Sequence, residues 1–104
     1  MRFGLEEKVW ESLTGILSEP DNVDKIILYG SRAKGVFREG SDIDLALVGE
    51  EIEIKQILGL SERVEQLNLP WEVDLCSYGT LMNQDLKNHI DRVGVELYHR
   101  KDAG

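Results

Sequence analysis

The stretch YGSRAKGVFREGSDIDLAL, residues 29–47, combines a glycine–serine turn with two closely spaced aspartates. Ten residues separate Ser31 from Asp42, and Asp44 follows after one apolar residue. Within SDIDLALVG, apolar residues alternate with other residues, which is the period of a strand with two unlike faces. We therefore expect Asp42 and Asp44 on the same face of one strand, with their backbones about 6.6–6.8 Å apart.

The rest of the chain alternates between the periods of helices and strands. An apolar stripe predicts a first helix over about residues 4–18, which the segment SEPDN ends. KIILYG is typical of a strand covered on both faces, and it ends at Gly30. The later elements are expected to be a strand at 41–49, a helix at 51–68, a strand at 71–77, a helix at 82–94 and a short strand at 95–99. This order indicates an α+β fold.

The composition is that of one small acidic domain. The 104 residues, 41% of them apolar, suffice for one core, so we expect a single domain over residues 1–104. The net charge of −8 argues against a surface that follows a nucleic-acid backbone, and no direct nucleic-acid binding is expected. A single cysteine, an acidic N-terminal segment and the lack of a membrane-length apolar run predict a cytoplasmic protein without membrane contact.

A third acid extends the pair of aspartates. Asp74 lies on the predicted strand WEVDLCS, and carboxylates on neighbouring strands can converge on divalent cations. Two ions about 3.5–4 Å apart would offset the repulsion between these acids. A strand ends at Gly30 and Ser31, where backbone N–H groups and a hydroxyl can hold phosphate oxygens. The residues therefore indicate a two-metal site beside a phosphate-binding turn.

This combination resembles the signature of a known family. Gly30-Ser31, the ten-residue interval, the Asp42-Ile43-Asp44 triplet and Asp74 are similar to the minimal nucleotidyltransferases, which include the MntA-like antitoxins, of the DNA polymerase beta superfamily. The resemblance covers nearly the whole chain, because a pattern near its end also fits: Ile90, Gly94, Leu97, Tyr98. It implies a single-domain nucleotidyltransferase fold with a mixed sheet of about four strands flanked by helices.

The resemblance implies a reaction as well as a fold. In that family, AMP passes from ATP to a hydroxyl group and pyrophosphate leaves. Asp42 and Asp44 would bridge two Mg²⁺ ions. Asp74 would bind one of the ions and help to deprotonate the acceptor hydroxyl. The three aspartates are thus the expected catalytic and metal-binding residues.

The same resemblance assigns nucleotide-binding residues. The turn at Gly30 and Ser31 would hold the terminal phosphates of ATP, and Arg32 and Lys34 would add charge stabilisation. Many relatives carry arginine where this chain has Lys34. Lysine offers a point charge in place of a planar fork, so the family role does not transfer unchanged to that position.

The acceptor hydroxyl is expected on another polypeptide, because 104 residues leave no separate domain to bind it. In the resembling family the usual partner is an all-helical HEPN-type toxin, and the nucleotidyltransferase acts as an antitoxin by attaching AMP to a tyrosine. Two alternatives stay open. The acceptor could be a small hydroxylated molecule such as an aminoglycoside, or the chain could be a binding module that covers a toxin without catalysis.

Several conspicuous residues are expected to have no catalytic role. Neither His89 nor His99 has a cysteine or histidine at zinc-ligand spacing. Cys76 has no histidine partner in sequence that would activate it as a nucleophile. Trp10 and Trp71 lie on apolar stripes and are expected in the core, although Trp71 could also flank a nucleobase.

Overall fold

The computed structural model describes residues 1–101, and its four strands form one mixed sheet in the order β3-β2-β1-β4. The strands are β1 (Val23–Tyr29), β2 (Ile43–Gly49), β3 (Val73–Ser77) and β4 (Val95–His99). β2 runs parallel to β3, whereas β1 is antiparallel to β2 and to β4. This arrangement confirms the predicted α+β fold with a mixed four-stranded sheet. Its extent as one domain stays a prediction, and residues 102–104 lie outside the described residues.

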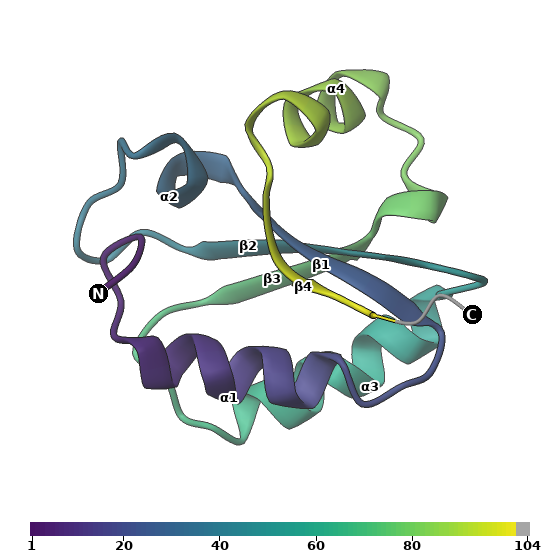
Figure 1. Ribbon diagram of the computed structural model, residues 1–104, viewed down its shortest axis with the longest axis horizontal. Helices are drawn as coiled ribbons and strands as arrows, with labels where there is room; N and C mark the ends of the chain where they lie inside the picture. Colours follow the sequence, from purple (N-terminus) through teal and green to yellow (C-terminus); the bar gives the residue numbers. More distant parts are fainter. Residues whose placement is uncertain (102–104) are drawn as a thin grey trace.

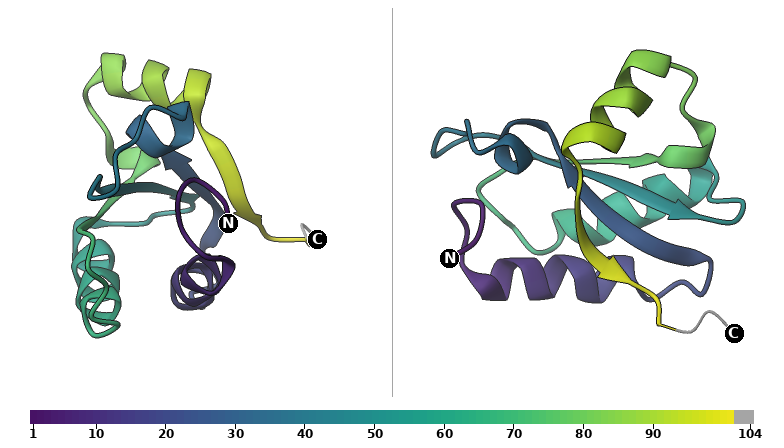
Figure 2. Two further views of the ribbon diagram at one scale, coloured as in Figure 1. Left: turned by 90° about the vertical axis from the view of Figure 1, so that its left-hand side faces the viewer. Right: turned by 45° about the horizontal axis from the view of Figure 1, so that its top comes forward.

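Helices cover both faces of the sheet (Figures 1 and 2). Helices α1 (Glu7–Leu17) and α3 (Ile54–Glu65) lie side by side below the sheet in the view of Figure 1. The short helix α2 (Gly30–Lys34) and helix α4 (Gln84–Val93) lie above it, and the 3-10 turn η1 (Tyr78–Thr80) leads from β3 towards α4. None of the described helices is long and apolar enough to cross a membrane.

The hydrophobic core lies between the sheet and the α1–α3 layer. On β2, the alternating residues Ile43, Leu45 and Leu47 are fully buried in this core. Each such side chain contributes roughly 1.5–3 kcal/mol through removal from water. Helices α1 and α3 and strand β1 supply their main partners: Trp10, Leu13, Leu17, Ile57, Leu60, Val64, Ile26, Leu28. Because side chains alternate along a strand, Asp44 of β2 faces the opposite layer, with α2 and α4.

The N-terminal residues differ from the predicted helix over residues 4–18. The helix begins at Glu7, and a tight turn precedes it, closed by two 2.9 Å hydrogen bonds between the backbones of Arg2 and Leu5. Phe3 and Gly4 have φ values of 53° and 82°, which are incompatible with a helix. Leu5 is nevertheless buried, so the apolar stripe identified its burial and missed its conformation.

The predicted strand at 95–99 is confirmed as β4, and the other predicted elements are present with shorter or shifted ends. The helix expected at 51–68 spans Ile54–Glu65, because Glu51 and Asn68 adopt positive φ values of 50° and 54° outside it. The strand expected at 41–49 begins at Ile43, so Asp42 lies just before it. Three further elements are found within the predicted regions or displaced by a few residues: β1 at Val23–Tyr29, β3 at Val73–Ser77, α4 at Gln84–Val93.

Candidate active site

The acidic residues lie at one edge of the α2–α4 face. In the sheet register, Asp44 of β2 is opposite Tyr29 of β1 and opposite Asp74 of the parallel strand β3. The two carboxyl groups interact, since the charge of Asp74 and hydrogen bonding to it are among the causes that raise the pKa of Asp44. Asp42 lies two residues before Asp44, and its charge also acts on that carboxyl group. The predicted convergence of Asp44 and Asp74 from two strands is therefore present.

The position of Asp44 disfavours its charged form. Partial burial raises the pKa of Asp44, and the neighbouring charges of Asp74 and Asp42 raise it further. A hydrogen bond between two carboxyl groups needs a proton on one of them. A divalent cation would favour the ionised pair by replacing that proton with positive charge. Asp74 is exposed to solvent, so the pair is open to a ligand.

The residues fit the predicted metal in kind but do not form a complete metal site. Carboxylate oxygens are the ligands that Mg²⁺ prefers, and the pair of Asp44 and Asp74 supplies them. Within residues 1–101, however, no group of three or more His, Cys, Asp or Glu side chains is arranged to hold an ion. The three-carboxylate site and its two Mg²⁺ ions therefore stay predictions.

Gly30 begins α2 directly beside the acidic pair. Its φ of 77° lies in the left-handed region, and a Cβ atom at this position would overlap Oδ2 of Asp44. Its N–H donates a 3.2 Å hydrogen bond to Nε2 of His89, a residue of α4. The His89 ring also meets the ring of Tyr29 edge-on, with centroids 6.1 Å apart. Glycine is required here because the backbone is confined between a carboxylate and an imidazole.

Sequence reasoning missed His89, to which it assigned no role. The imidazole accepts a hydrogen bond at the turn where phosphate binding is predicted, so Nε2 carries no proton in this arrangement. The two residues are 59 positions apart, and no local motif links them. Only the packing of α4 above the sheet brings His89 to this turn.

Ser31 and Lys34 follow Gly30 on α2, as the prediction of nucleotide contacts requires. Ser31 is partly buried and Lys34 is exposed. Within the described residues, neither the hydroxyl of Ser31 nor the ammonium group of Lys34 takes part in a hydrogen bond or ion pair. Both groups are therefore available to a ligand beside the acidic pair.

The position of Arg32 gives no support to the expectation that it binds phosphate. Its side chain is 1% exposed, and its guanidinium donates hydrogen bonds to the carbonyl groups of Phe3, Glu39 and Ser41. A guanidinium that is buried and committed to carbonyl oxygens cannot also contact a nucleotide without breaking this arrangement. The sequence could not show this, because Phe3 is 29 positions away from Arg32.

Two further polar groups lie close to the acids without being reactive. The hydroxyl of Tyr29 and the thiol of Cys76 are 3.6 Å apart. Burial raises the pKa of both groups, and the charges of Asp44 and Asp74 raise each of them further. Cys76 therefore stays a thiol at neutral pH, in line with the expectation that it is not a nucleophile.

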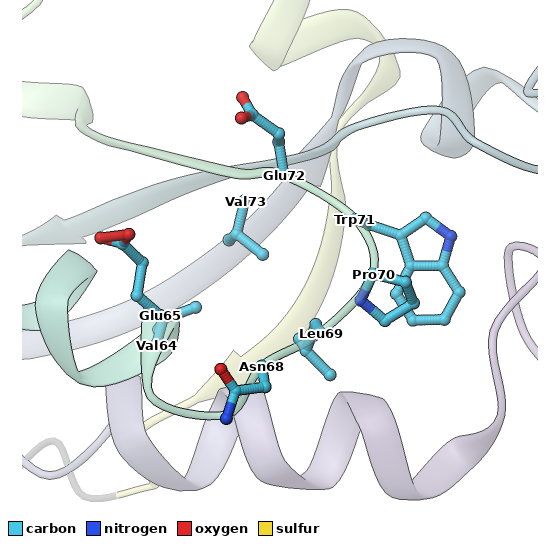
Figure 3. Close-up of a pocket in the computed structure, with 8 residues that line it drawn as sticks. All are labelled: Val64, Glu65, Asn68, Leu69, Pro70, Trp71, Glu72 and Val73. Atoms are coloured by element: carbon cyan, nitrogen blue, oxygen red, sulfur yellow. The ribbon is translucent and has the colours of Figure 1, made fainter.

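A separate groove lies between the end of α3 and the start of β3 (Figure 3). Trp71 borders it, and its Nε1 donates a 3.0 Å hydrogen bond to the carbonyl oxygen of Glu39. None of the predicted metal- or phosphate-binding residues lines this groove. Its walls come from one continuous segment and the end of α3: Val64, Glu65, Asn68, Leu69, Pro70, Trp71, Glu72, Val73. The groove gives no support to the idea that Trp71 flanks a base beside the acids.

Replacing Asp44 with asparagine is expected to stabilise the metal-free protein at neutral pH. The pKa of Asp44 is raised, so native wild-type protein loses stability as pH rises through that value, whereas asparagine stays neutral. We expect a Tm gain of about 2–6 °C at pH 7 that disappears below the ordinary pKa of an aspartate. Thermal unfolding of both proteins across this pH range measures it. A gain that persists at low pH would show that charge is not the cause.

Replacing Gly30 with alanine is expected to destabilise the protein more than the same change at Gly35. Both glycines have φ near 80°, so each variant incurs a backbone cost of about 1–2 kcal/mol. Only at Gly30 does the added Cβ overlap Asp44, since nothing lies within 4 Å of it at Gly35. The Tm of Gly30→Ala should therefore be lower, and an Asp44→Ala background should recover part of the loss. Equal losses at the two positions would contradict the close contact.

The chain is similar to known nucleotidyltransferases in sequence as well as in fold. The family model described as polymerase beta, nucleotidyltransferase, matches residues 11–103. A curated relative, the probable protein adenylyltransferase MntA of Haemophilus influenzae, is 34% identical over 74 residues. That alignment covers 70% of this chain and 64% of the relative, so the chain matches less than two thirds of the relative's length.

Solved structures show the same fold at lower identity. One is the tri-AMPylated HEPN toxin of Shewanella oneidensis in complex with MNT antitoxin, with a TM-score of 0.72 and 16% identity over 93% of this chain and 75% of the matched chain. Another is a toxin-antitoxin structure with AMP-PNP, with a TM-score of 0.71 and 21% identity over 93% and 76% of the two chains. The family model covers nearly the whole sequence, and the chain therefore belongs to the polymerase beta nucleotidyltransferase family.

Proposed function

We propose that this chain transfers AMP from ATP to a hydroxyl group, a tyrosine of a HEPN-type toxin partner, and thereby acts as an antitoxin. The observation that carries the proposal is the pair of Asp44 and Asp74 beside the Gly30 turn, in a chain that belongs to a nucleotidyltransferase family. The curated relative, described as a probable protein adenylyltransferase, supports a protein as the acceptor.

In this proposal Asp42, Asp44 and Asp74 would together hold two Mg²⁺ ions. The ions supply neutralising charge for the triphosphate of ATP. Asp74, which is exposed, takes the proton of the acceptor hydroxyl. The oxygen of that hydroxyl bonds to the α-phosphorus at the same time. The bond from the α-phosphorus to the bridging oxygen breaks, and pyrophosphate leaves.

The residues that follow Gly30 are proposed to orient the triphosphate. Ser31 offers a hydroxyl, and the exposed Lys34 offers an ammonium group, both from the helix that begins beside the acids. Phosphoryl transfer depends mainly on positioning and on neutralising phosphate charge, which these groups can provide. Arg32 is left out of this contact because its guanidinium is buried among carbonyl groups.

A cytoplasmic location and a helical HEPN partner complete the proposal. The curated relative and the solved toxin complexes support the partner class, while this chain covers only part of that relative. The net charge of −8 suits a complex with a basic surface on the partner, because complementary charges speed association and orient the two proteins.

A second candidate function is an antitoxin that binds and occludes its toxin without catalysis. One observation favours it: within residues 1–101 the acids do not gather into a site of three or more metal ligands. The two candidates separate in cells that express the toxin. If Asp42→Asn, Asp44→Asn and Asp74→Asn together leave neutralisation intact, binding alone is sufficient, and loss of neutralisation with binding retained favours catalysis.

The catalytic proposal predicts that the chain labels its co-purified partner when incubated with ATP carrying ³²P at the α-phosphate and Mg²⁺. The Asp42→Asn, Asp44→Asn double variant should lose at least about 10³-fold in rate, since it removes carboxylate ligands that position charge in the transition state. Asp21→Asn, which changes an exposed aspartate in the turn before β1, is the matched control and should keep full activity.

Three outcomes distinguish the alternatives. Label on the partner that disappears only in the double variant supports the proposal. Label that instead requires an added aminoglycoside, with none on the partner, assigns the acceptor to a small molecule. If no label moves to either acceptor, or if the double variant labels as well as the wild type, the catalytic proposal is wrong.

A further inference from the structure

Arg32 holds a charge where the fold has no ion pair for it. It is the one charged side chain that is fully buried within residues 1–101. None of the ion pairs in this part of the chain involves it, and the nearby carbonyl groups satisfy it instead. Burying a guanidinium raises the free energy of the folded state unless its donors are well placed. A buried arginine without an ion pair therefore indicates a structural or functional role.

The guanidinium joins two segments that are distant in sequence. Nη1 donates a 2.8 Å hydrogen bond to the carbonyl oxygen of Phe3, and Nε and Nη2 donate 3.1 Å and 2.7 Å bonds to that of Ser41. The rings of Phe37 and Trp71 lie 5.3 Å and 5.8 Å from its central carbon, within the range of cation–π attraction. Arg32 therefore fastens the loop before β2 to the N-terminal turn.

The fastened loop leads directly to the first predicted metal ligand. The carbonyl group of Ser41 belongs to the peptide bond that precedes Asp42, and two donors of Arg32 fix its plane. On the other side of Asp42, the N–H of Ile43 donates a 2.9 Å bond to the carbonyl oxygen of Glu72. The backbone of Asp42 is thus held from both sides. Burial lowers the pKa of Arg32, and the charge of Asp42 acts in the opposite direction by favouring the protonated guanidinium.

The N-terminal turn is held in place by contacts with helix α1 and with the loop before β2. Trp10 is buried, its Nε1 donates a 2.9 Å hydrogen bond to the carbonyl oxygen of Arg2, and its ring meets that of Phe3 edge-on. A Cβ atom on Gly4 would overlap the ring of Phe37, so the turn packs closely against the loop. Core helix α1 thereby supports the loop through Trp10 and the turn.

We infer that Arg32 is a positioning residue for Asp42: it sets the carboxylate where a divalent cation can be bound and does not contact the nucleotide. This inference rests on the proposed metal site. It assigns the N-terminal turn a part in cation binding, since the Phe3 carbonyl group anchors the same guanidinium. Lysine could keep the charge but could not reach both segments, because its donors share one nitrogen atom.

Binding of Mn²⁺ alone to the full chain, measured by electron paramagnetic resonance, tests the inference without requiring catalysis. Arg32→Lys is expected to raise the dissociation constant for Mn²⁺ at least about tenfold, the effect typical of a group that orients a metal ligand. Arg100→Lys is the matched control, because Arg100 also donates to carbonyl groups, those of Pro20 and Val23, at the other end of β1. Its dissociation constant should match that of the wild type.

Phe37→Leu covers the case in which Arg32→Lys does not fold, as judged by circular dichroism. This variant keeps the guanidinium and removes one aromatic ring beside it, and it should raise the dissociation constant about two- to fivefold. If Arg32→Lys folds and its dissociation constant for Mn²⁺ equals that of the wild type, the inference is wrong. If Arg32→Lys does not fold, a wild-type dissociation constant in Phe37→Leu also overturns the inference. Wild-type binding that Asp42→Asn leaves unchanged would overturn the proposed metal site itself.

Discussion

The parallel pairing of β2 with β3 places Asp44 directly opposite Asp74, and the candidate site depends on this one pairing. Two acids at adjacent positions repel each other unless a proton or a cation lies between them. The repulsion between Asp44 and Asp74 arises on the face of the sheet that α2 and α4 partly cover. The opposite face of the same strand contributes Ile43, Leu45 and Leu47 to the core, which holds the register fixed.

The surroundings of the acids are built from segments that are remote in sequence. Gly30 fits against Asp44 because it has no side chain, and His89 from α4 holds its N–H. The side chain of Arg32, on the same helix, reaches the loop that leads to Asp42 and donates a hydrogen bond to the carbonyl oxygen of Ser41. One short helix, α2, thus contacts both ends of the acidic segment, and the core helix α1 supports it through the N-terminal turn.

Local patterns in the sequence predicted the elements and the acids, but not the contacts between distant segments. Alternation along residues 41–49 placed Asp44 away from the core, and the stripe on α3 identified Ile57, Leu60 and Val64 as buried. The strand order β3-β2-β1-β4 depends on long-range pairing, which has no local signature. The roles of Arg32 and His89 were missed for the same reason, since their partners are 29 and 59 positions away. The turn at Phe3 and Gly4 was missed because the apolar stripe continues through Leu5.

The proposed function requires that Asp42, Asp44 and Asp74 together bind divalent cations around a triphosphate. Anomalous diffraction from crystals grown with Mn²⁺ and a non-hydrolysable ATP analogue would locate both the ions and the phosphates. We expect manganese peaks between these carboxylates, at distances of about 2.0–2.2 Å from their oxygens, with the terminal phosphates at the turn that begins at Gly30. Manganese and nucleotide bound elsewhere, or acids that remain apart without metal between them, would contradict it.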